Sequence, residues 1–297
     1  MQKKVRLALG SGGARGMAHI GVIEALHEHG FEIVEVSGSS MGAIVGGLYC
    51  AGHLDAYTKW LKSLSRLDVF KLLDFTFSSQ GFVKGEKVFK AIEQLIGDHQ
   101  IENFKIPFTA VATDLIHRKE IHYKQGSLFK ALRASVAIPT IFTPVDDQGT
   151  QLVDGGVLNP VPVNVLKKQA EDWVVAVNIS AQKPIQQKIQ PEINKQEANK
   201  ERAAYLHMMD QFRNQILRLD SKAEENVEKL GLFDILNKSY DLTQDRLTDL
   251  MFEMHNPELI VEVSRDACGV FEFYRAQEMI DLGKKAFNDA LASKHSL

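Results

Sequence analysis

A serine in the GSSMG segment at residues 38–42 is the first candidate for covalent chemistry in this sequence. The segment follows a short apolar run typical of a strand and precedes small residues typical of a helix. In a GxSxG turn at such a junction, the serine hydroxyl projects at the carboxyl edge of the sheet. Gly38 and Gly42 let the neighbouring backbones approach without Cβ clashes. The pattern predicts that Ser40 is a nucleophile and that the N–H of Met41 points toward a developing oxyanion; the alternative is a Ser/Gly-rich connection.

A second glycine-rich turn, GSGGARG at residues 10–16, follows the first apolar run and begins a helical pattern. Backbone N–H groups at a helix start can hold a phosphate or a carbonyl oxyanion. The dinucleotide-binding pattern GxGxxG, read from Gly10, needs a glycine where Arg15 stands. It also needs an acidic residue after the second strand, where GSSMG stands. The turn therefore favours an oxyanion hole that faces the serine over a nucleotide site.

An aspartate followed by two glycines forms the third candidate, Asp154-Gly155-Gly156. Asp and Gly are favoured turn residues, so the segment can be a simple hairpin turn. In the functional interpretation, Asp154 is a base and the glycines allow its close approach to the serine. The local sequence leaves both interpretations open.

These three segments must be positioned by a sheet, and the order of the expected elements indicates which kind. Strands are expected at residues 5–9, 31–36, 108–113, 120–123, 173–179 and 259–263, and helices at 17–29, 42–51, 127–134 and 273–291. The chain thus begins as strand, glycine turn, helix, strand, glycine turn, helix. That order predicts an α/β fold with parallel strands flanked by helices. Both glycine turns then lie at the same edge of the sheet.

Residues 181–255 differ in character from the rest of the chain. Their first part is rich in Gln, Lys, Glu and Asn, which is typical of an exposed linker or a solvated helix. Apolar residues at spacings of three and four then predict an amphipathic helix over residues 203–230. Its apolar face packs on its own domain or contacts a second copy or a lipid. We expect one α/β domain over residues 1–297, with its core at 4–180 and 256–292 and a helical excursion between.

Composition places the chain among ordinary globular proteins. Its 297 residues carry 35 Lys+Arg and 38 Asp+Glu, a formal net charge of −3, with 44% apolar residues. The sequence has no dense stripe of Lys and Arg that would predict a nucleic-acid partner. It also has no run of the ~18 to 20 apolar residues that a membrane span needs. The two cysteines, Cys50 and Cys268, lack the spacing of a disulfide scaffold or zinc site and fit a reducing compartment. We expect a cytoplasmic protein, with contact at the inner face of the membrane left open.

Taken together and in this order, the three segments resemble the patatin-like phospholipase family, most closely its short bacterial RssA-like branch. Residues 111–114 look like the family's ATDL strand end, and residues 133–144 look like its RASxAIPxxFxP segment. The Asp-Gly-Gly segment, with NPVP at 159–162, is similar to the family's DGG…NPxP. The resemblance is strong over roughly residues 4–180 and weak over 258–290.

The resemblance implies a three-layer α/β/α fold with a mainly parallel sheet and a Ser–Asp dyad at the carboxyl edge of the strands. Ser40 would be the nucleophile and Asp154 the general base, with no histidine, cofactor or metal. The implied activity is that of a serine acyl-ester hydrolase (phospholipase A, lysophospholipase or lipid esterase) with an acyl-enzyme intermediate. The implied oxyanion hole comprises Gly12, Gly13, Ala14, Arg15, Gly16 and Met41. Ser11 departs from the family, which often has glycine there.

Two other functions stay open at this point. A conventional α/β-hydrolase would need a triad in the chain order Ser, Asp, His, so His207 or His255 would have to serve. Alternatively, the protein is a binding or regulatory module for acyl chains or a partner protein, with little or no turnover. The presence of Ser40, Asp154 and both glycine turns favours the enzyme, because a degenerate site should have lost one of them.

Phospholipids, lysophospholipids, acylglycerols and soluble acyl esters all fit these motifs. Residues 62–104 are apolar enough to form a lid or an acyl-binding wall, through Leu72, Leu73, Phe75, Phe77 and Phe82. The expected partners are a lipid or acyl-ester substrate, a membrane surface, and a second copy of the chain bound through residues 203–230.

Overall fold

The computed structural model describes residues 3–78, 81–83, 85–139, 141–147, 149–184 and 232–295. The amphipathic helix predicted over 203–230 lies outside the described residues, and so does most of the predicted linker before it. The side chains of Phe75, Phe77 and Phe82 also lie outside the described set.

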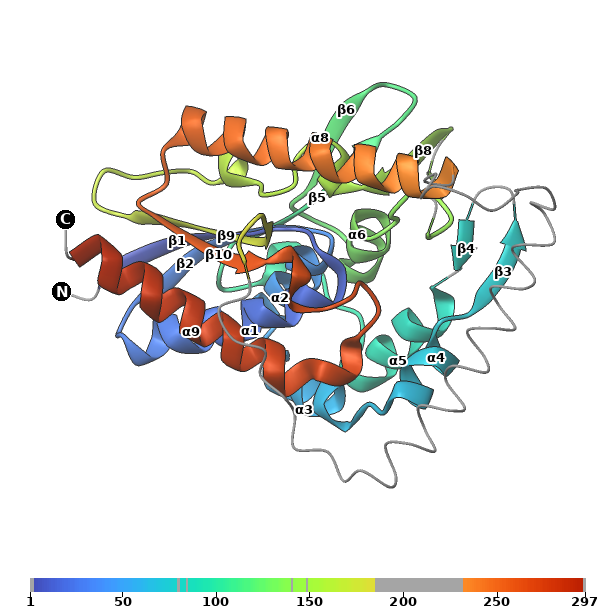
Figure 1. The fold of residues 1–297 in the computed structure, drawn as a ribbon, viewed down its shortest axis with the longest axis horizontal. Helices are drawn as coiled ribbons and strands as arrows, with labels where there is room; N and C mark the ends of the chain where they lie inside the picture. The colour runs from blue at the N-terminus through green and yellow to red at the C-terminus, as the bar shows by residue number, and fades with distance from the viewer. Residues whose placement is uncertain are drawn as a thin grey trace, which may run out of the picture.

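A mixed sheet of eight strands runs through the middle of the molecule (Figure 1). Its order is β10-β9-β1-β2-β5-β8-β7, and β6 pairs with β5. The strands are β1 (Lys4–Leu9), β2 (Glu32–Ser39), β5 (Phe108–Asp114), β6 (Lys119–Tyr123), β7 (Val145–Asp147), β8 (Thr150–Asp154), β9 (Trp173–Ala181) and β10 (Leu259–Ser264). Strands β10, β9, β1, β2 and β5 pair in parallel, and the pairs that involve β6, β7 and β8 are antiparallel. The predicted mainly parallel sheet is confirmed.

The predicted strands are present with small changes at their ends. Strand β2 runs three residues beyond the expected end, to Ser39, and β9 runs to Ala181. Strands β7 and β8 were not expected; they form a hairpin with each other, so the hairpin turn lies before β8. The Asp-Gly-Gly segment comes at the other end of β8. The interpretation of that segment as a hairpin turn is therefore wrong.

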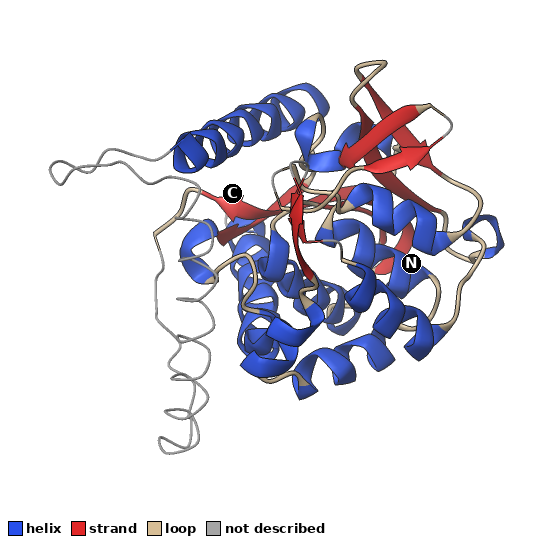
Figure 2. Cartoon of the chain, turned by 90° about the vertical axis from the view of Figure 1, so that its right-hand side faces the viewer, coloured by secondary structure: helices blue, strands red, loops and turns tan. Residues whose placement is uncertain are grey.

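Helices cover both faces of the sheet (Figures 1 and 2). One layer contains α1 (Ala18–Glu28), α2 (Met41–Cys50), α6 (Leu128–Ser135) and α9 (Ala276–His295), and the other contains α8 (Leu232–His255). The three-layer α/β/α fold is confirmed. A 3₁₀ turn at Phe273–Arg275 precedes α9, where the sequence predicted regular helix.

Alternate side chains of the central strands enter two cores. Leu7 and Leu9 of β1 belong to the larger core, which α1, α2 and α9 complete. Ala8 points the other way, into a smaller core with Val174, and Phe252 of α8 packs against it. Because parallel strands inside such a sheet are buried on both faces, they read as continuous apolar runs. That is why β1 and β9 were recognisable in the sequence.

The region between α2 and β5 forms an additional wall beside the main sheet. It contains α3 (Leu54–Ser63), α4 (Arg66–Leu72), the antiparallel pair β3 (Phe75–Ser78) and β4 (Gly81–Val83), and α5 (Glu86–Ile96). Helix α4 begins with a capping box between Ser65 and Asp68. Helix α3 packs against α2 and α5, and α5 packs against α6. This wall therefore lies next to the elements that carry Ser40.

Candidate functional site

Ser40 occupies the sharp turn between β2 and α2. Its backbone has φ 56° and ψ −124°, a positive φ that few residues other than glycine adopt. A Cβ added at Gly38 would overlap the backbone of Gly42, and one at Gly42 would overlap the carbonyl of Leu9. Both glycines are therefore required by close backbone approach. The predicted elbow is present, with Ser40 buried at its tip.

Ser135, at the end of α6, stabilises this elbow. Its hydroxyl accepts a hydrogen bond from the backbone N–H of Ser40 at 3.0 Å and donates one to the carbonyl of Val111 at 2.6 Å. The preceding serine, Ser39, donates to the carbonyl of Asn159 at 2.7 Å. Sequence reasoning assigned no role to Ser135. In the sequence, the only signal for a role of Ser135 was its place in the segment at residues 133–144.

The register of the sheet places Asp154 beside the elbow. Strand β6 pairs with one edge of β5, and both β2 and β8 pair with the other edge. Ser39, the last residue of β2, is opposite Val111, and Asp154, the last residue of β8, is opposite Ala112. The two strand ends therefore meet at adjacent positions along β5. A Cβ at Gly155 would overlap the carbonyl of Val111, so this approach needs a glycine.

The Asp154 carboxyl group is buried, with 1% of the residue exposed. Its Oδ1 accepts a hydrogen bond from the N–H of Gly156 at 2.7 Å. Among the described residues, no hydrogen bond of normal geometry reaches Oδ2. Burial raises the pKa of Asp154 to about 7, although the neighbouring Ser40 hydroxyl and the Gly156 N–H act in the opposite direction. A carboxyl group with this pKa can accept and return a proton near neutral pH.

The glycine turn at residues 10–16 lies directly against the elbow. It forms a 3₁₀ turn, η1 (Gly13–Met17), and a Cβ added at Gly16 would overlap the Met41 side chain. Gly13 has φ 57° and lines the same pocket as Ser40 and Met41. As the first residue of α2, Met41 has an N–H without an intrahelical acceptor. Gly13 and Met41 are therefore suitable donors for an oxyanion.

Two residues of the predicted oxyanion hole have other hydrogen bonds. The N–H of Ala14 donates to the carbonyl of Val270 at 2.9 Å, so this N–H is already paired. The Arg15 guanidinium donates to Ile179 O at 2.9 Å and to Cys268 O at 3.2 Å. These bonds fasten the turn to β9 and to the loop after β10. The Ala14 N–H is therefore occupied in this structure, and the assignment of the oxyanion hole to residues 12–16 and Met41 stays a prediction.

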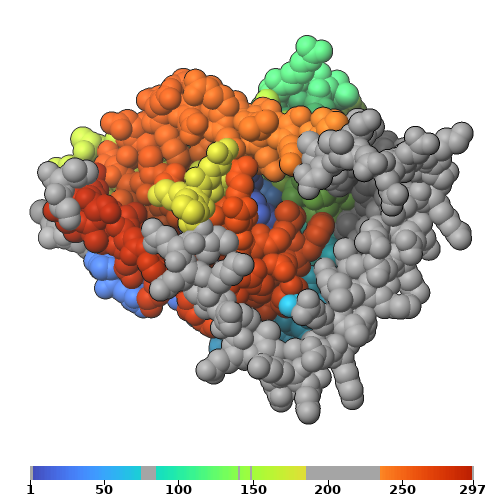
Figure 3. Space-filling view, viewed as in Figure 1, coloured from blue at the N-terminus to red at the C-terminus, as the bar shows by residue number. Residues whose placement is uncertain are grey.

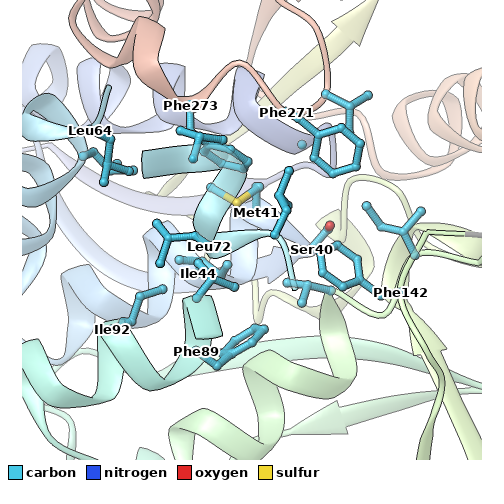
Figure 4. A pocket seen from close by; sticks show the side chains of 18 of the residues that line it. Ser40, Met41, Ile44, Leu64, Leu72, Phe89, Ile92, Phe142, Phe271 and Phe273 are labelled. Carbon is cyan, nitrogen blue, oxygen red and sulfur yellow. The ribbon is translucent and has the colours of Figure 1, made fainter. Parts of the chain in front are cut away.

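An apolar pocket opens beside Ser40 (Figure 4). The cavity has a volume of about 80 Å³. Its walls come from α2, α3, α4, α5, the loop after α6 and the segment before α9. Lining side chains include Ile44, Leu61, Leu72, Leu73, Phe89, Ile92, Phe142 and Phe273. Leu72 and Leu73 thus have the position expected for an acyl-binding wall.

The other polar candidates have structural roles or lie apart. Asp114 caps the turn after β5, accepting hydrogen bonds at 3.0 Å from the N–H groups of Ile116 and His117. His255 is the last residue of α8, and His207 lies outside the described residues. No histidine in the described ranges has a hydrogen bond with Ser40 or Asp154 that meets normal geometry.

Two features are absent from the described ranges, a metal-binding cluster and a membrane-spanning helix. The described ranges hold no group of three or more His, Cys, Asp or Glu side chains arranged to bind a metal ion. None of the helices in those ranges has the length and apolarity needed to cross a membrane.

Sequence reasoning also missed Gln244 of α8, whose amide reaches the carbonyl of Gly156 at 3.1 Å. No local signal in the excursion indicated this contact.

Comparison with known proteins matches most of the chain to the family that its sequence motifs resemble. The family model described as patatin-like phospholipase matches residues 7–167. An uncharacterized NTE family protein of Mycobacterium tuberculosis is 34% identical, over 97% of this chain and 91% of that protein. A lysophospholipase of Emericella nidulans is 33% identical over 60% of this chain, which corresponds to 12% of its own length. Human patatin-like phospholipase domain-containing protein 6 is 32% identical over 60% of this chain and 13% of its own length.

Among solved structures, VipD from Legionella pneumophila matches with a TM-score of 0.46 and 14% identity, covering 97% of this chain and 67% of that one. The family model spans the elbow, the glycine turn and the Asp-Gly-Gly segment. Since that model matches more than half of the chain, and a full-length relative is 34% identical, the chain belongs to the patatin-like phospholipase family.

Proposed function

We propose that this protein is a serine acyl-ester hydrolase that uses Ser40 and Asp154 as a catalytic dyad. The observation that carries the proposal is the buried Asp154 carboxyl group, whose Oδ2 has no hydrogen bond of normal geometry from a described residue. It lies beside a serine held in an elbow conformation. A structural aspartate in this position would be expected to have both oxygens paired. A base must instead keep an oxygen for the proton that it accepts.

In the proposed mechanism, Asp154 accepts the Ser40 hydroxyl proton while Oγ forms a bond to the ester carbonyl carbon. The N–H groups of Met41 and Gly13 donate hydrogen bonds to the oxyanion. The protonated Asp154 returns its proton to the leaving alcohol, and the acyl group stays on Ser40. Water then attacks the acyl-enzyme, its proton passes to Asp154, and the carboxylic acid leaves. Asp154 finally returns that proton to Ser40 Oγ.

The pocket favours an ester of a long acyl chain. Its lining is almost wholly apolar, and Ser40 lies at one side of it (Figure 4). Burying methylene groups there would contribute about 0.8 kcal/mol each. The name lysophospholipase, which relatives of similar sequence carry, agrees with this substrate class. Contact with a membrane surface, a cytoplasmic location and pairing through residues 203–230 stay predictions.

Labelling by a fluorophosphonate probe tests this function directly. We expect the probe to label the wild-type protein and not Ser40→Ala, because the phosphorus centre requires an activated serine oxygen. The matched control is Ser39→Ala, whose hydroxyl donates to Asn159 and does not face the pocket; it should still be labelled. A panel of phospholipids, lysophospholipids and acylglycerols, hydrolysed by wild type but not by Ser40→Ala, would then identify the substrate.

Two results would contradict the proposal. A folded wild-type protein that is neither labelled nor active on any lipid would favour a binding module. Loss of activity in His255→Ala with retained folding would favour a Ser-Asp-His triad instead. We expect His255→Ala to be active, because His255 lies about 16.5 Å along α8, at 1.5 Å per residue, from Gln244, which contacts the Asp-Gly-Gly turn.

A further inference from the structure

Helix α8 brings one amide side chain, that of Gln244, between two segments of the candidate site. Its nitrogen lies 3.1 Å from the carbonyl oxygen of Gly156 and 3.2 Å from the hydroxyl oxygen of Ser11. Gly156 is the last residue of the Asp-Gly-Gly segment, and Ser11 belongs to the glycine turn at residues 10–16. A single side chain of α8 thus contacts both segments. The residues of α8 lie outside the match to the family model.

The hydrogen-bonding partners of Gln244 determine the orientation of its amide group. A carbonyl oxygen can only accept, so one of the two N–H protons of the amide points to Gly156. The second proton is left for the hydroxyl oxygens of Ser11 and Tyr240, at 3.2 and 3.0 Å. Gln244 therefore supplies a side-chain donor to a backbone carbonyl that follows the base by two residues.

The surroundings of Gly156 show how closely these groups approach the base. A Cβ built on Gly156 would lie 2.4 Å from Gln244 Nε2, 2.8 Å from Ser11 Oγ and 3.0 Å from Asp154 Oδ1. The N–H of Gly156 donates to that same Oδ1 at 2.7 Å. Gly156 is thus held on two sides, its carbonyl by Gln244 and its N–H by the carboxyl group. A displacement of the carbonyl would turn the backbone that presents the N–H to Asp154.

Helix α8 is fastened to the rest of the fold next to Gln244. Asp245 pairs with Arg265, after β10, and accepts a hydrogen bond from Gln182 at 2.6 Å. Two turns further along the helix, Phe252 packs against the smaller core. A side chain holds its partners in place only when its own element is fixed. These contacts supply that support for Gln244.

We propose that Gln244 is a positioning residue of the site: it holds the Gly156 carbonyl, and with it the N–H that orients the Asp154 carboxyl group. This inference rests on the function proposed above for the dyad. The backbone already joins the two segments, because the Ser11 N–H donates to the carbonyl of Pro160 at 2.9 Å. Loss of the Gln244 amide should therefore leave the fold in place and loosen Gly156.

A weaker hydrogen bond from Gly156 should change how Asp154 titrates. This N–H and the Ser40 hydroxyl, both neutral, lower the pKa of Asp154 against the larger effect of burial. Tyr240 is the titratable group bonded to Gln244, and burial raises its pKa well above the ordinary value, so it stays neutral. Because donors favour the charged form of a carboxyl group, loosening Gly156 should raise the pKa of Asp154. The acidic limb of the pH profile should then move to higher pH.

The charged groups of this region belong to α8, η1 and the segment after β10. Burial raises the pKa of Asp241, and Arg265 and Arg15 act against that rise. Asp245 adds a second negative charge beside Asp241 and pairs with Arg265. A neutral substitution at residue 244 leaves all these charges in place. The difference between the two pH profiles therefore reports the loss of the amide.

The test compares Gln244→Leu with wild type in the pH dependence of kcat/KM on a short 4-nitrophenyl ester. We expect the acidic limb to rise by about 0.5 to 1 pH unit, part of the effect of one hydrogen bond to a charged group. At pH 7 we expect kcat to fall about 5- to 10-fold, with KM within about twofold, because Gln244 is not among the residues that line the apolar pocket. The matched control is Gln277→Leu, which removes an exposed amide bonded to Asp281 at 2.8 Å on α9; its acidic limb should coincide with that of wild type.

The outcomes separate this inference from the function on which it rests. An inactive and unlabelled wild type overturns both. An active wild type, with a Gln244→Leu acidic limb within about 0.2 unit of it, overturns the inference alone, even if the variant melts at a lower temperature. If Gln244→Leu does not fold, Gln244→Met decides, because it keeps the length of the side chain and removes only the amide. An unchanged limb in Gln244→Met then overturns the inference.

Discussion

The backbone of Ser40 has a conformation that costs free energy, and its neighbours compensate for that cost. A residue other than glycine with positive φ carries a strain of about 1–3 kcal/mol, and Ser40 has φ 56°. The hydroxyl of Ser135 accepts its N–H, and the parallel pairing of β2 with β5 fixes the strand that leads into the turn. The position of the Ser40 hydroxyl thus depends on a residue outside the proposed dyad.

The change Ser135→Ala tests this support at the residue scale. It removes the acceptor of the buried Ser40 N–H, which should cost about 1–3 kcal/mol of unfolding free energy. We expect kcat to fall about tenfold or more, because a small displacement of the nucleophile lowers the rate strongly. The measurements are urea unfolding and ester hydrolysis. Ser293→Ala is the control, since that exposed hydroxyl also donates to a backbone carbonyl, of Asp289 at 2.9 Å; equal effects of both variants would contradict the role of Ser135.

At the scale of elements, a close backbone contact occurs where α1 crosses α9. A Cβ at Gly21 of α1 would overlap the carbonyl of Ile280, and one at Gly283 of α9 would overlap the carbonyl of Ala18. The two helices therefore touch backbone to backbone through a glycine from each. Figure 1 shows them side by side beneath the sheet. This contact joins the C-terminal helix to the helix that follows the glycine turn.

The change Gly283→Ala should separate these helices. Inserting one methyl group against fixed backbone costs typically about 1–3 kcal/mol, and here both faces are backbone, so we expect the upper end. The unfolding midpoint in urea or on heating measures this loss. Lys285→Ala, on the exposed side of α9, should change the unfolding free energy by no more than about 0.5 kcal/mol. A Gly283→Ala protein as stable as wild type would show that the crossing has room to open.

At the scale of the whole molecule, the site is held by segments from both ends of the chain. The glycine turn near the N-terminus bonds through Arg15 and Ala14 to residues 179, 268 and 270. Helix α8 covers the other side of the sheet and stays exposed along its outer face (Figure 3). Asp154 is buried between these layers. Its raised pKa therefore makes the unfolding free energy of the whole protein depend on pH.

The direction of this pH dependence follows from which state, folded or unfolded, binds the Asp154 proton more strongly. The unfolded Asp154 has a pKa near 3.8 and the folded one near 7, so between these values the folded state holds the extra proton. The contribution of Asp154 to stability is complete below about pH 4 and is lost as pH rises through about 7. We expect Asp154→Asn to be inactive yet more stable than wild type at pH 8, by an amount of the order of 4 kcal/mol.

Urea unfolding of both proteins at pH 5 and pH 8 measures this difference. It should be larger at pH 8, because at pH 5 wild-type Asp154 keeps its proton in the folded state. Other titrating groups are common to the two proteins and cancel in the difference. If the two proteins show the same pH dependence, the Asp154 carboxyl group is not buried as described.

Much of the fold and the location of the candidate site were predictable from the sequence alone. The parallel strands β1 and β9 appear as apolar runs because burial on both faces leaves no polar positions. The elbow around Ser40 and the glycine turn were also recognisable. Positive φ and close backbone approach select glycine and small residues within a few positions of each other. Such requirements act locally, so they can be read from a single segment.

Only the tertiary structure decided which distant residues contact the segments of the proposed dyad. Ser135 reaches Ser40 across 95 positions and Gln244 reaches Ser11 across 233, and neither side chain carries a local signal of its partner. The N–H of Ala14, a residue of the predicted oxyanion hole, is likewise bonded to the distant Val270. The physical reason is that hydrogen bonds between distant segments depend on strand register and helix docking. Those follow from the packing of the whole chain, whereas turn conformation and strand burial follow from neighbouring residues.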